Sequence, residues 1–194
     1  QARRQEEGEG PGRPPRIAAL EHLGVRLAAT IAAVACLALA GAGEPPAPKR
    51  SPAGLALVAM TVGGEPVEVE VADTPDARDR GLGGRTAVPR GSGMLFVFPA
   101  ADFLSFWMLD CLVPIDVAFF AADGSVTAVH AMRAEPPRGK DEAVAAYRAR
   151  LPRYGSPTRA VGALELGAGE MARLGVKAGS KLTLPAGVTV PARR

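Results

Sequence analysis

Two carboxylates in apolar surroundings are the residues of this 194-residue sequence that most readily suggest a catalytic function. Asp116 precedes a run of apolar residues, and Glu165 lies between two leucines. A carboxylate in such surroundings needs a partner, and its pKa can be displaced. If both face one cleft, they can serve as acid and base in the cleavage of a sugar. Each also has a structural alternative: Asp116 can accept backbone N–H groups at a turn, and Glu165 can pair with Arg80 or Arg85.

The only tryptophan, Trp107, is the second feature that suggests a site. It belongs to residues 96–120, which contain seven of the nine aromatic residues and are therefore expected to hold much of the core. In a strand, Trp107 points to the opposite side from its neighbours Phe106 and Met108. It is therefore either a core residue or the wall of a pocket, where its ring would stack on a ligand.

Further polar or reactive residues lie in or near this stretch, namely Asp110, Cys111 and His130. With Asp116 they provide too few metal ligands, at no recognised spacing, so we expect neither a metal nor another cofactor. We interpret His130 as a structural residue of a strand. Cys111 is interpreted as a buried, unreactive thiol, with a metal or redox role as the alternative. Ser156 lacks the sharp turn that presents a catalytic serine, so the sequence does not predict a hydrolase triad.

The N-terminal part has the pattern of an export signal. Four arginines lie within residues 1–16, and residues 27–42 carry no charge and end in small residues. The apolar run is shorter than the roughly 20 residues that span a bilayer comfortably. We therefore predict that residues 1–43 form a signal peptide or, alternatively, an N-terminal membrane anchor. The protein would be periplasmic, or tethered to the membrane and facing the periplasm. Cys36 in this run is a weak candidate for lipid attachment.

Residues 44–54 are rich in proline and are predicted to form a linker, followed by one domain at 55–185 and a tail at 186–194. Two apolar runs flank Gly63-Gly64 and predict a β-hairpin, and Thr74-Pro75 begins a short helix. Strands and helices do not alternate regularly. We therefore predict a mainly β fold, a single compact antiparallel sandwich or partly open barrel with two or three short helices. Strands are expected at 55–62, 67–72, 94–98, 104–108, 115–121, 126–132, 160–166 and 181–184, and further helical segments at 141–150 and 170–174.

The charges of the chain do not suggest a nucleic-acid partner. Beyond residue 43 there are 18 basic and 16 acidic residues, and the two signs are interspersed. A nucleic-acid site would require a basic stripe with aromatic residues between the charges. The locally basic group Arg148, Arg150, Arg153 and Arg159 is interpreted as a solvated face or loop.

Nine short motifs follow one another between residues 55 and 184: Val69–Pro75, Arg80–Leu82, Gly93–Phe98, Phe106–Met108, Pro114–Phe119, Asp123–Gly124, His130–Met132, Tyr154–Ser156 and Ala163–Leu166. In this order and spacing they resemble the DUF192 family, a bacterial and archaeal domain of unknown function. The resemblance implies a compact, mainly β domain that is commonly exported and has no agreed activity. It also places Tyr154 and Glu165 at motif positions.

The sequence departs from the family pattern at three places. Leu109-Asp110-Cys111 replaces a usual Lys-Asn-Thr, Gly167 replaces an Asn, and the segment 133–153 is unusual. If the lost Lys and Asn line a functional site, this chain binds something different or nothing.

Three functions remain open at this point. The first is a non-enzymatic binding module of the cell envelope, with a cleft for a small polar ligand or a peptide strand. Its candidate ligand-binding residues are Trp107, Asp110, Asp116, Tyr154 and Glu165. The second is an envelope enzyme that acts on carbohydrate or peptidoglycan through Asp116 and Glu165. The third is a structural partner in an envelope assembly, which predicts an exposed apolar patch and no concave pocket.

Overall fold

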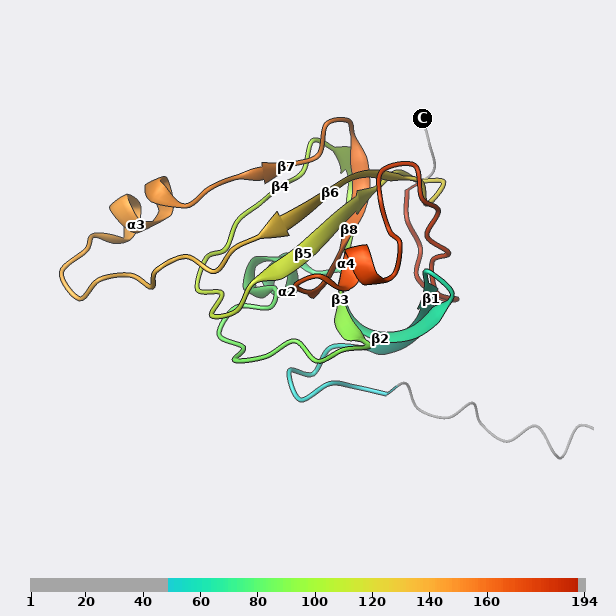
Figure 1. Ribbon diagram of the computed structural model, residues 1–194, viewed down its shortest axis with the longest axis horizontal. Helices are drawn as coiled ribbons and strands as arrows, with labels where there is room; N and C mark the ends of the chain where they lie inside the picture. The colour runs from blue at the N-terminus through green and yellow to red at the C-terminus, as the bar shows by residue number, and fades with distance from the viewer. Residues whose placement is uncertain (1–48, 192–194) are drawn as a thin grey trace, which may run out of the picture. The chain divides into compact units, whose positions relative to one another are not determined.

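The computed structural model describes residues 49–191 (Figure 1). The predicted signal peptide or anchor at 1–43 and the first part of the predicted linker lie outside the described residues. Within 49–191, no helix is both long and apolar enough to cross a membrane.

Six strands form one sheet in the order β1-β2-β3-β8-β5-β6, and two short strands, β4 and β7, form a second sheet. The strands are β1 (Leu57–Val62), β2 (Glu65–Ala72), β3 (Ser92–Asp102), β4 (Ser105–Phe106), β5 (Ile115–Phe120), β6 (Val126–Met132), β7 (Tyr154–Gly155) and β8 (Ala160–Gly167). The helices are α2 (Pro75–Arg80), α3 (Val144–Arg150) and α4 (Glu170–Arg173). The predicted mainly β class with short helices is confirmed. The six-stranded sheet is not closed into a barrel, since β1 and β6 form its two edges.

The first half of the sheet combines an antiparallel hairpin with a parallel pair. β1 and β2 meet around Gly63-Gly64, where both glycines have positive φ. β2 and β3 then run parallel, which the predicted antiparallel arrangement did not include. The segment between them carries α2 and is long enough to return the chain to the same end of the sheet. The hydroxyl of Thr74 accepts a hydrogen bond from Ala77 N (3.2 Å) and so caps α2, as predicted.

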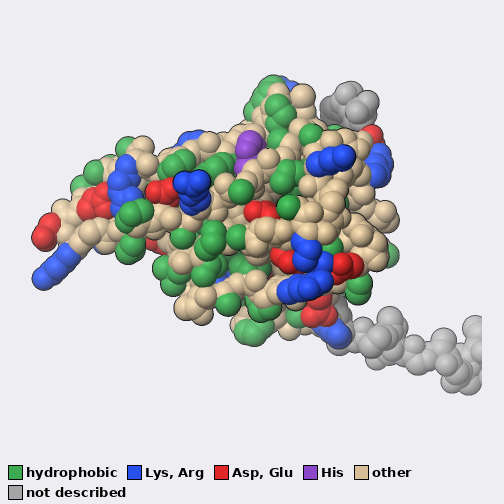
Figure 2. Space-filling model, in the orientation of Figure 1, with side chains coloured by type: hydrophobic (Ala, Val, Ile, Leu, Met, Phe, Trp, Pro, Cys, Tyr) green, Lys and Arg blue, Asp and Glu red, His purple; other side chains and the backbone are tan. Residues whose placement is uncertain are grey.

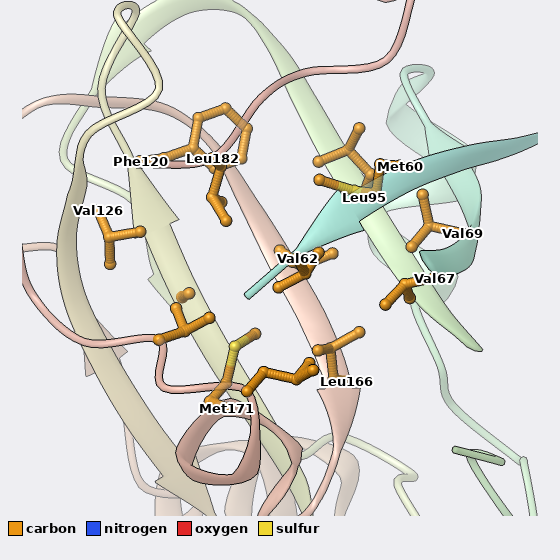
Figure 3. Close-up of a cluster of buried hydrophobic side chains, with 14 of the residues drawn as sticks. Met60, Val62, Val67, Val69, Leu95, Phe120, Val126, Leu166, Met171 and Leu182 are labelled. Carbon is orange, nitrogen blue, oxygen red and sulfur yellow. The ribbon is translucent and has the colours of Figure 1, made fainter. Parts of the chain in front are cut away.

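The first face of the sheet is covered largely by apolar side chains, which leave pockets of about 270 and 300 Å³. Alternate residues of the strands, among them Leu95, Phe120 and Leu166, pack here against Met171 of α4 (Figure 3). Leu182, which follows α4, closes the same cluster. This face thus owes its cover to the last 25 or so residues of the domain, which cross it after β8 (Figure 1).

The second face carries the other half of the core and most of the aromatic rings. Phe106 of β4 contacts Phe96 and Phe119 edge-on, with ring centroids 4.9 and 5.2 Å apart. Such edge-to-face pairs stabilise a core beyond the area they bury. Phe96 and Phe119 of the aromatic stretch form core on the face opposite to α4, as predicted, whereas Phe120 packs on the α4 face and Phe103 is exposed.

Several element boundaries differ from the sequence predictions. The strand expected at 104–108 is reduced to β4, so Trp107 lies outside a strand, and strand alternation does not set its direction. β3 continues through Pro99, which we expected to end it. The proline is tolerated because the register with β8 shifts between Val97 and Asp102. α3 begins at Val144 without a side-chain cap, and not at Asp141. Residues 181–184 form only a single bridge, between Lys181 and Ser125, and no strand.

Both ends of the described chain pack on the domain. The hydroxyl of Ser51 is buried and donates to Glu70 of β2 (2.9 Å), so the packed chain begins before residue 55, where we predicted its start. Val188 and Val190, in the predicted tail, pack against the first-face cluster.

Candidate functional site

A pocket of about 360 Å³ opens on the second face of the sheet. Its walls come from α2, from the segment that contains β4 and Trp107, and from α3, while β3 and β8 form its floor. The size falls at the lower end of the range typical of small-ligand sites.

Glu165 of β8 lies at the floor of this pocket. Its row across the sheet, set by the strand registers, consists of Glu70, Met94, Glu165, Val117 and His130. Glu165 is only 5% exposed, and its two flanking residues in the row are apolar. Its carboxyl forms no hydrogen bond or ion pair within residues 49–191. In that range, every side-chain polar atom that is fully enclosed has a hydrogen-bond partner, so the oxygens of Glu165 are not fully enclosed. The carboxyl oxygens therefore reach the pocket.

Burial dominates the electrostatics of Glu165. Loss of hydration raises the pKa of this carboxyl to about 8, and the nearby positive charge of Arg85 opposes the change. Arg85 does not neutralise Glu165 because its guanidinium pairs with Glu70 instead, at 2.6 Å. The predicted Glu165–Arg85 ion pair is therefore not formed. At neutral pH, Glu165 is largely protonated and can both donate and accept a hydrogen bond.

The thiol of Cys111 also lines the pocket. It is partly exposed and not fully buried as predicted. Burial, with the negative charges of Glu165 and Asp110, raises the pKa of the thiol to about 12. Because the thiolate is the nucleophile, Cys111 is a poor one at neutral pH.

Three arginines line the pocket: Arg78 and Arg80 from α2, and Arg148 from α3. Arg78 donates to the carbonyl oxygens of Asp73 (2.6 Å) and Val97 (2.9 Å). These bonds fix the guanidinium without neutralising its charge. None of the three arginines pairs with a carboxylate in the described part of the chain.

Trp107 forms part of the pocket wall and is neither fully buried nor fully exposed. The guanidinium of Arg153 lies 3.6 Å from the ring centroid, and that of Arg148 lies 5.8 Å from it. Arginine stacks well on an indole ring. Both arginines are exposed, in agreement with the predicted solvated face or loop, and they also contact the tryptophan that we expected to be a pocket wall or a core residue.

The segment between β6 and β7 forms an arm with α3 at its end (Figure 1). The arm is held by Tyr147, which is buried and accepts a hydrogen bond from Asp110 N (3.1 Å). Asp110 has a φ of 55°, a conformation in which Asp and Asn are the commonest non-glycine residues. Two departures from the family pattern, 109–111 and 133–153, thus contact each other beside the pocket.

The other predicted carboxylate, Asp116, lies on the first face. It stands opposite Leu166 in the sheet, whereas Glu165 stands opposite Val117 one residue away, so the two side chains point to opposite faces. Asp116 is 4% exposed and accepts a hydrogen bond from Met171 N (3.1 Å) at the start of α4. Its structural alternative is therefore the one observed, and the two carboxylates do not share a cleft.

The remaining predicted residues lie outside the pocket or form no catalytic arrangement. His130 Nε2 donates to Gly155 O (3.0 Å), and its ring packs against Tyr154. The hydroxyl of Ser156 accepts from Leu104 N (2.9 Å), which joins β4 to β7 and presents no nucleophile. Within 49–191, no three His, Cys, Asp or Glu side chains gather closely enough to hold a metal ion.

The structure thus unites two of the five candidate residues, Trp107 and Glu165, in the pocket, while Asp110 borders it through its backbone. Sequence reasoning missed the arginines of the wall. Arg80 and Arg148 are exposed, so the local pattern did not distinguish them from ordinary surface residues. Their place at the pocket depends on contacts between distant segments, for which the sequence carries no local signal.

Comparison with known proteins agrees with the motifs found in the sequence. The DUF192 family model, described as an uncharacterized ACR, matches residues 58–184. A structure from Sinorhizobium meliloti, described as a proposed transcription regulator, is 30% identical, with a TM-score of 0.53 over 68% of this chain and 93% of that one. A protein of unknown function from Novosphingobium aromaticivorans is 27% identical, with a TM-score of 0.57 over 73% of this chain and 95% of that one. No curated protein matches the sequence.

Proposed function

Since the chain belongs to the DUF192 family, whose description assigns no activity, we propose from its pocket that it is a non-enzymatic module that binds a small polar ligand. The observation that carries this proposal is the position of Glu165. A buried carboxyl without a partner costs stability, and such groups are retained at functional sites more often than elsewhere. Here the carboxyl lies at the floor of an open pocket, where a ligand can supply the missing hydrogen bond.

The wall of the pocket supports a binding role. Trp107 is partly exposed between Arg148 and Arg153, and the partly exposed Phe98 and Phe106 provide further apolar surface. Small-ligand sites typically combine such apolar walls with a few convergent polar groups.

Two features favour binding over catalysis. Asp116 and Glu165 point to opposite faces, so they cannot act as an acid–base pair on one substrate. The thiol of Cys111, which lines the same pocket, is held in its protonated form at neutral pH.

The cell envelope is the proposed place of action. This proposal rests on the basic lead and uncharged run of residues 1–43, which have the pattern of an export signal. We do not propose a nucleic-acid partner, although one related structure is described as a proposed transcription regulator. On the side of the domain seen in Figure 2, basic and acidic side chains alternate and form no basic stripe.

A ligand screen on the full chain tests the proposal. Thermal unfolding would be followed for the parent, for Trp107→Ala and for the control Arg159→Ala. Arg159 belongs to the same arginine group in the sequence but pairs with Asp102 outside the pocket. We expect at least one polar compound that raises Tm of the parent and the control but not of the Trp107 variant. Compounds that shift all three proteins equally, or none at all, would contradict the proposal.

A further inference from the structure

We propose that the pocket selects a small organic anion with a flat apolar body, whose negative group is bound by the arginines of α2 and α3. The inference rests on the proposed function and names the ligand class of the same pocket. It draws on the charge of the wall, the shape and character of the interior, and the protonation state of the floor.

The charge of the wall favours an anion. Arg78, Arg80 and Arg148 line the pocket from two separate segments, and Asp79 and Glu165 are the only carboxylate residues in that lining. The three guanidinium groups form no ion pair within the described chain. Guanidinium groups bind carboxylate and phosphate groups through two parallel hydrogen bonds, so an anion would pair with guanidinium groups that no carboxylate of the described chain occupies.

The interior favours a flat apolar body. Phe98, Phe106 and Trp107 are partly exposed and line it beside more polar surface, and Arg78 and Arg153 already stack on Phe98 and Trp107. Rings of this kind bind a planar ligand through stacked or edge-to-face contacts. The volume of about 360 Å³ has room for one or two rings and not for a long chain.

The floor of the pocket does not oppose an anion at neutral pH. Burial raises the pKa of Glu165 to about 8, so the carboxyl is largely neutral at pH 7 and can donate a hydrogen bond to the ligand. The ionisable groups around Glu165 add no further negative charge to the floor. Arg85 pairs with Glu70, and the thiol of Cys111 keeps its proton at neutral pH. Asp79 of α2 is exposed.

Because Glu165 gains a negative charge when it ionises, the pH dependence of binding reveals whether the ligand is an anion, a cation or neutral. An anion binds the neutral form, so its affinity is full below pH 8 and falls as Glu165 ionises above that value. A cationic ligand would instead bind the ionised carboxylate, so its affinity would rise up to about pH 8 and level off above that value. A neutral ligand of the same shape would show neither trend.

Three probes of nearly equal shape separate these cases: benzoate, benzamide and benzamidine. Binding to the full chain would be measured by NMR titration between about pH 6 and pH 9, where the charges of the probes stay constant. We expect benzoate to bind best, with Kd of about 0.1–10 mM as is usual for so small a ligand. Its affinity should fall by up to about tenfold per pH unit above 8. Phenyl phosphate, run in parallel, shows whether the site prefers a phosphate to a carboxylate.

Matched variants locate the effect. Arg80→Ala and Arg148→Ala should each weaken benzoate about tenfold, since each removes a charge-assisted contact, whereas Arg159→Ala should leave the affinity unchanged. Glu165→Gln should still bind benzoate, because the amide can donate as the neutral carboxyl does, but without the fall above pH 8.

Other outcomes overturn the inference. Tightest binding of benzamidine with affinity rising with pH, or equal binding of benzamide, would exclude an anion while leaving a small-ligand module in place. Equal losses in all three arginine variants would indicate only general attraction by positive charge. If no probe binds at about 10 mM, the anion class is excluded, and the wider ligand screen alone decides whether the pocket binds any ligand.

Discussion

The two faces of the six-stranded sheet each bury a carboxylate, but the surroundings of the two groups differ. On the first face, Asp116 accepts a hydrogen bond from Met171 N, and α4 with the following segment covers much of the surface, although Asp116 also lines a pocket of about 300 Å³ beside Met171. On the second face, Glu165 has no partner in the described chain and borders an open pocket. Two acidic residues on neighbouring strands therefore have different roles, one fixing a helix and the other available to a ligand.

The difference follows from what covers each face. The cover of the first face comes from one segment that directly follows β8, and it packs with aliphatic side chains. The second face is covered by α2, by the segment around Trp107 and by the arm with α3, which come from three distant parts of the chain. These three segments border one another on the second face, and the pocket lies between them.

The largest expected contrast is in core stability. Phe120 on the first face is fully buried, so Phe120→Ala should lower the free energy of unfolding by about 3–5 kcal/mol. Phe98 at the pocket is only partly buried, so Phe98→Ala should cost roughly 1–2 kcal/mol. Urea unfolding of the full-length variants measures both. Equal losses would mean that the second face is as tightly sealed as the first.

The pH dependence of stability sharpens the contrast for Glu165. The pKa of its carboxyl in the folded protein, about 8, lies above the ordinary value of 4.5. Between these values the folded state holds a proton that the unfolded state has lost. The contribution of Glu165 to stability is therefore complete below about pH 4.5 and decreases by up to about 1.4 kcal/mol per unit as the pH rises toward 8.

Glu165→Gln is the matched control for this slope because it cannot ionise. The difference in unfolding free energy between the parent and this variant, measured by urea titration from about pH 5 to pH 8, isolates the effect of Glu165 from that of other groups. A difference that does not change with pH would show that Glu165 ionises normally.

The sequence predicted the elements better than it predicted the site. The alternation of Val67, Val69 and Val71 with polar residues and the cap at Thr74-Pro75 are local signals, and both elements formed as expected. The separation of Asp116 from Glu165 depends on the register between β5 and β8, where a shift of one residue reverses which face a side chain occupies. The contacts of Arg148 and Arg153 with Trp107 join segments about 40 residues apart, which no local pattern encodes.

A smaller effect is expected for the first-face carboxylate. Asp116→Ala removes the acceptor of Met171 N and leaves a buried donor without a partner, which should cost about 1–3 kcal/mol of unfolding free energy. By comparison, Glu165→Met should be neutral or stabilising, because it replaces an unpaired buried carboxyl with an apolar side chain. Thermal or urea unfolding at pH 7 compares the two variants, and a larger loss for the Glu165 variant would reverse the assigned roles.

The smallest expected effect concerns the arm. Tyr147→Phe removes the hydrogen bond from Asp110 N but keeps the buried ring, so stability should fall by about 0.5–1.5 kcal/mol. Hydrogen exchange should increase at the amide of Asp110 and in α3, while β5 and β8 stay protected. Unchanged exchange in the arm would show that this bond does not hold it.

The most direct test of the difference between the two faces is the titration of Glu165 itself. NMR of the side-chain carboxyl carbons in the full chain, with Glu165→Gln to assign the signal, reports its protonation state at each pH. The account predicts a midpoint near pH 8, as expected for a buried, unpaired carboxyl at the floor of a pocket. A midpoint near the ordinary value of 4.5 would show that Glu165 is hydrated or paired and would contradict the account.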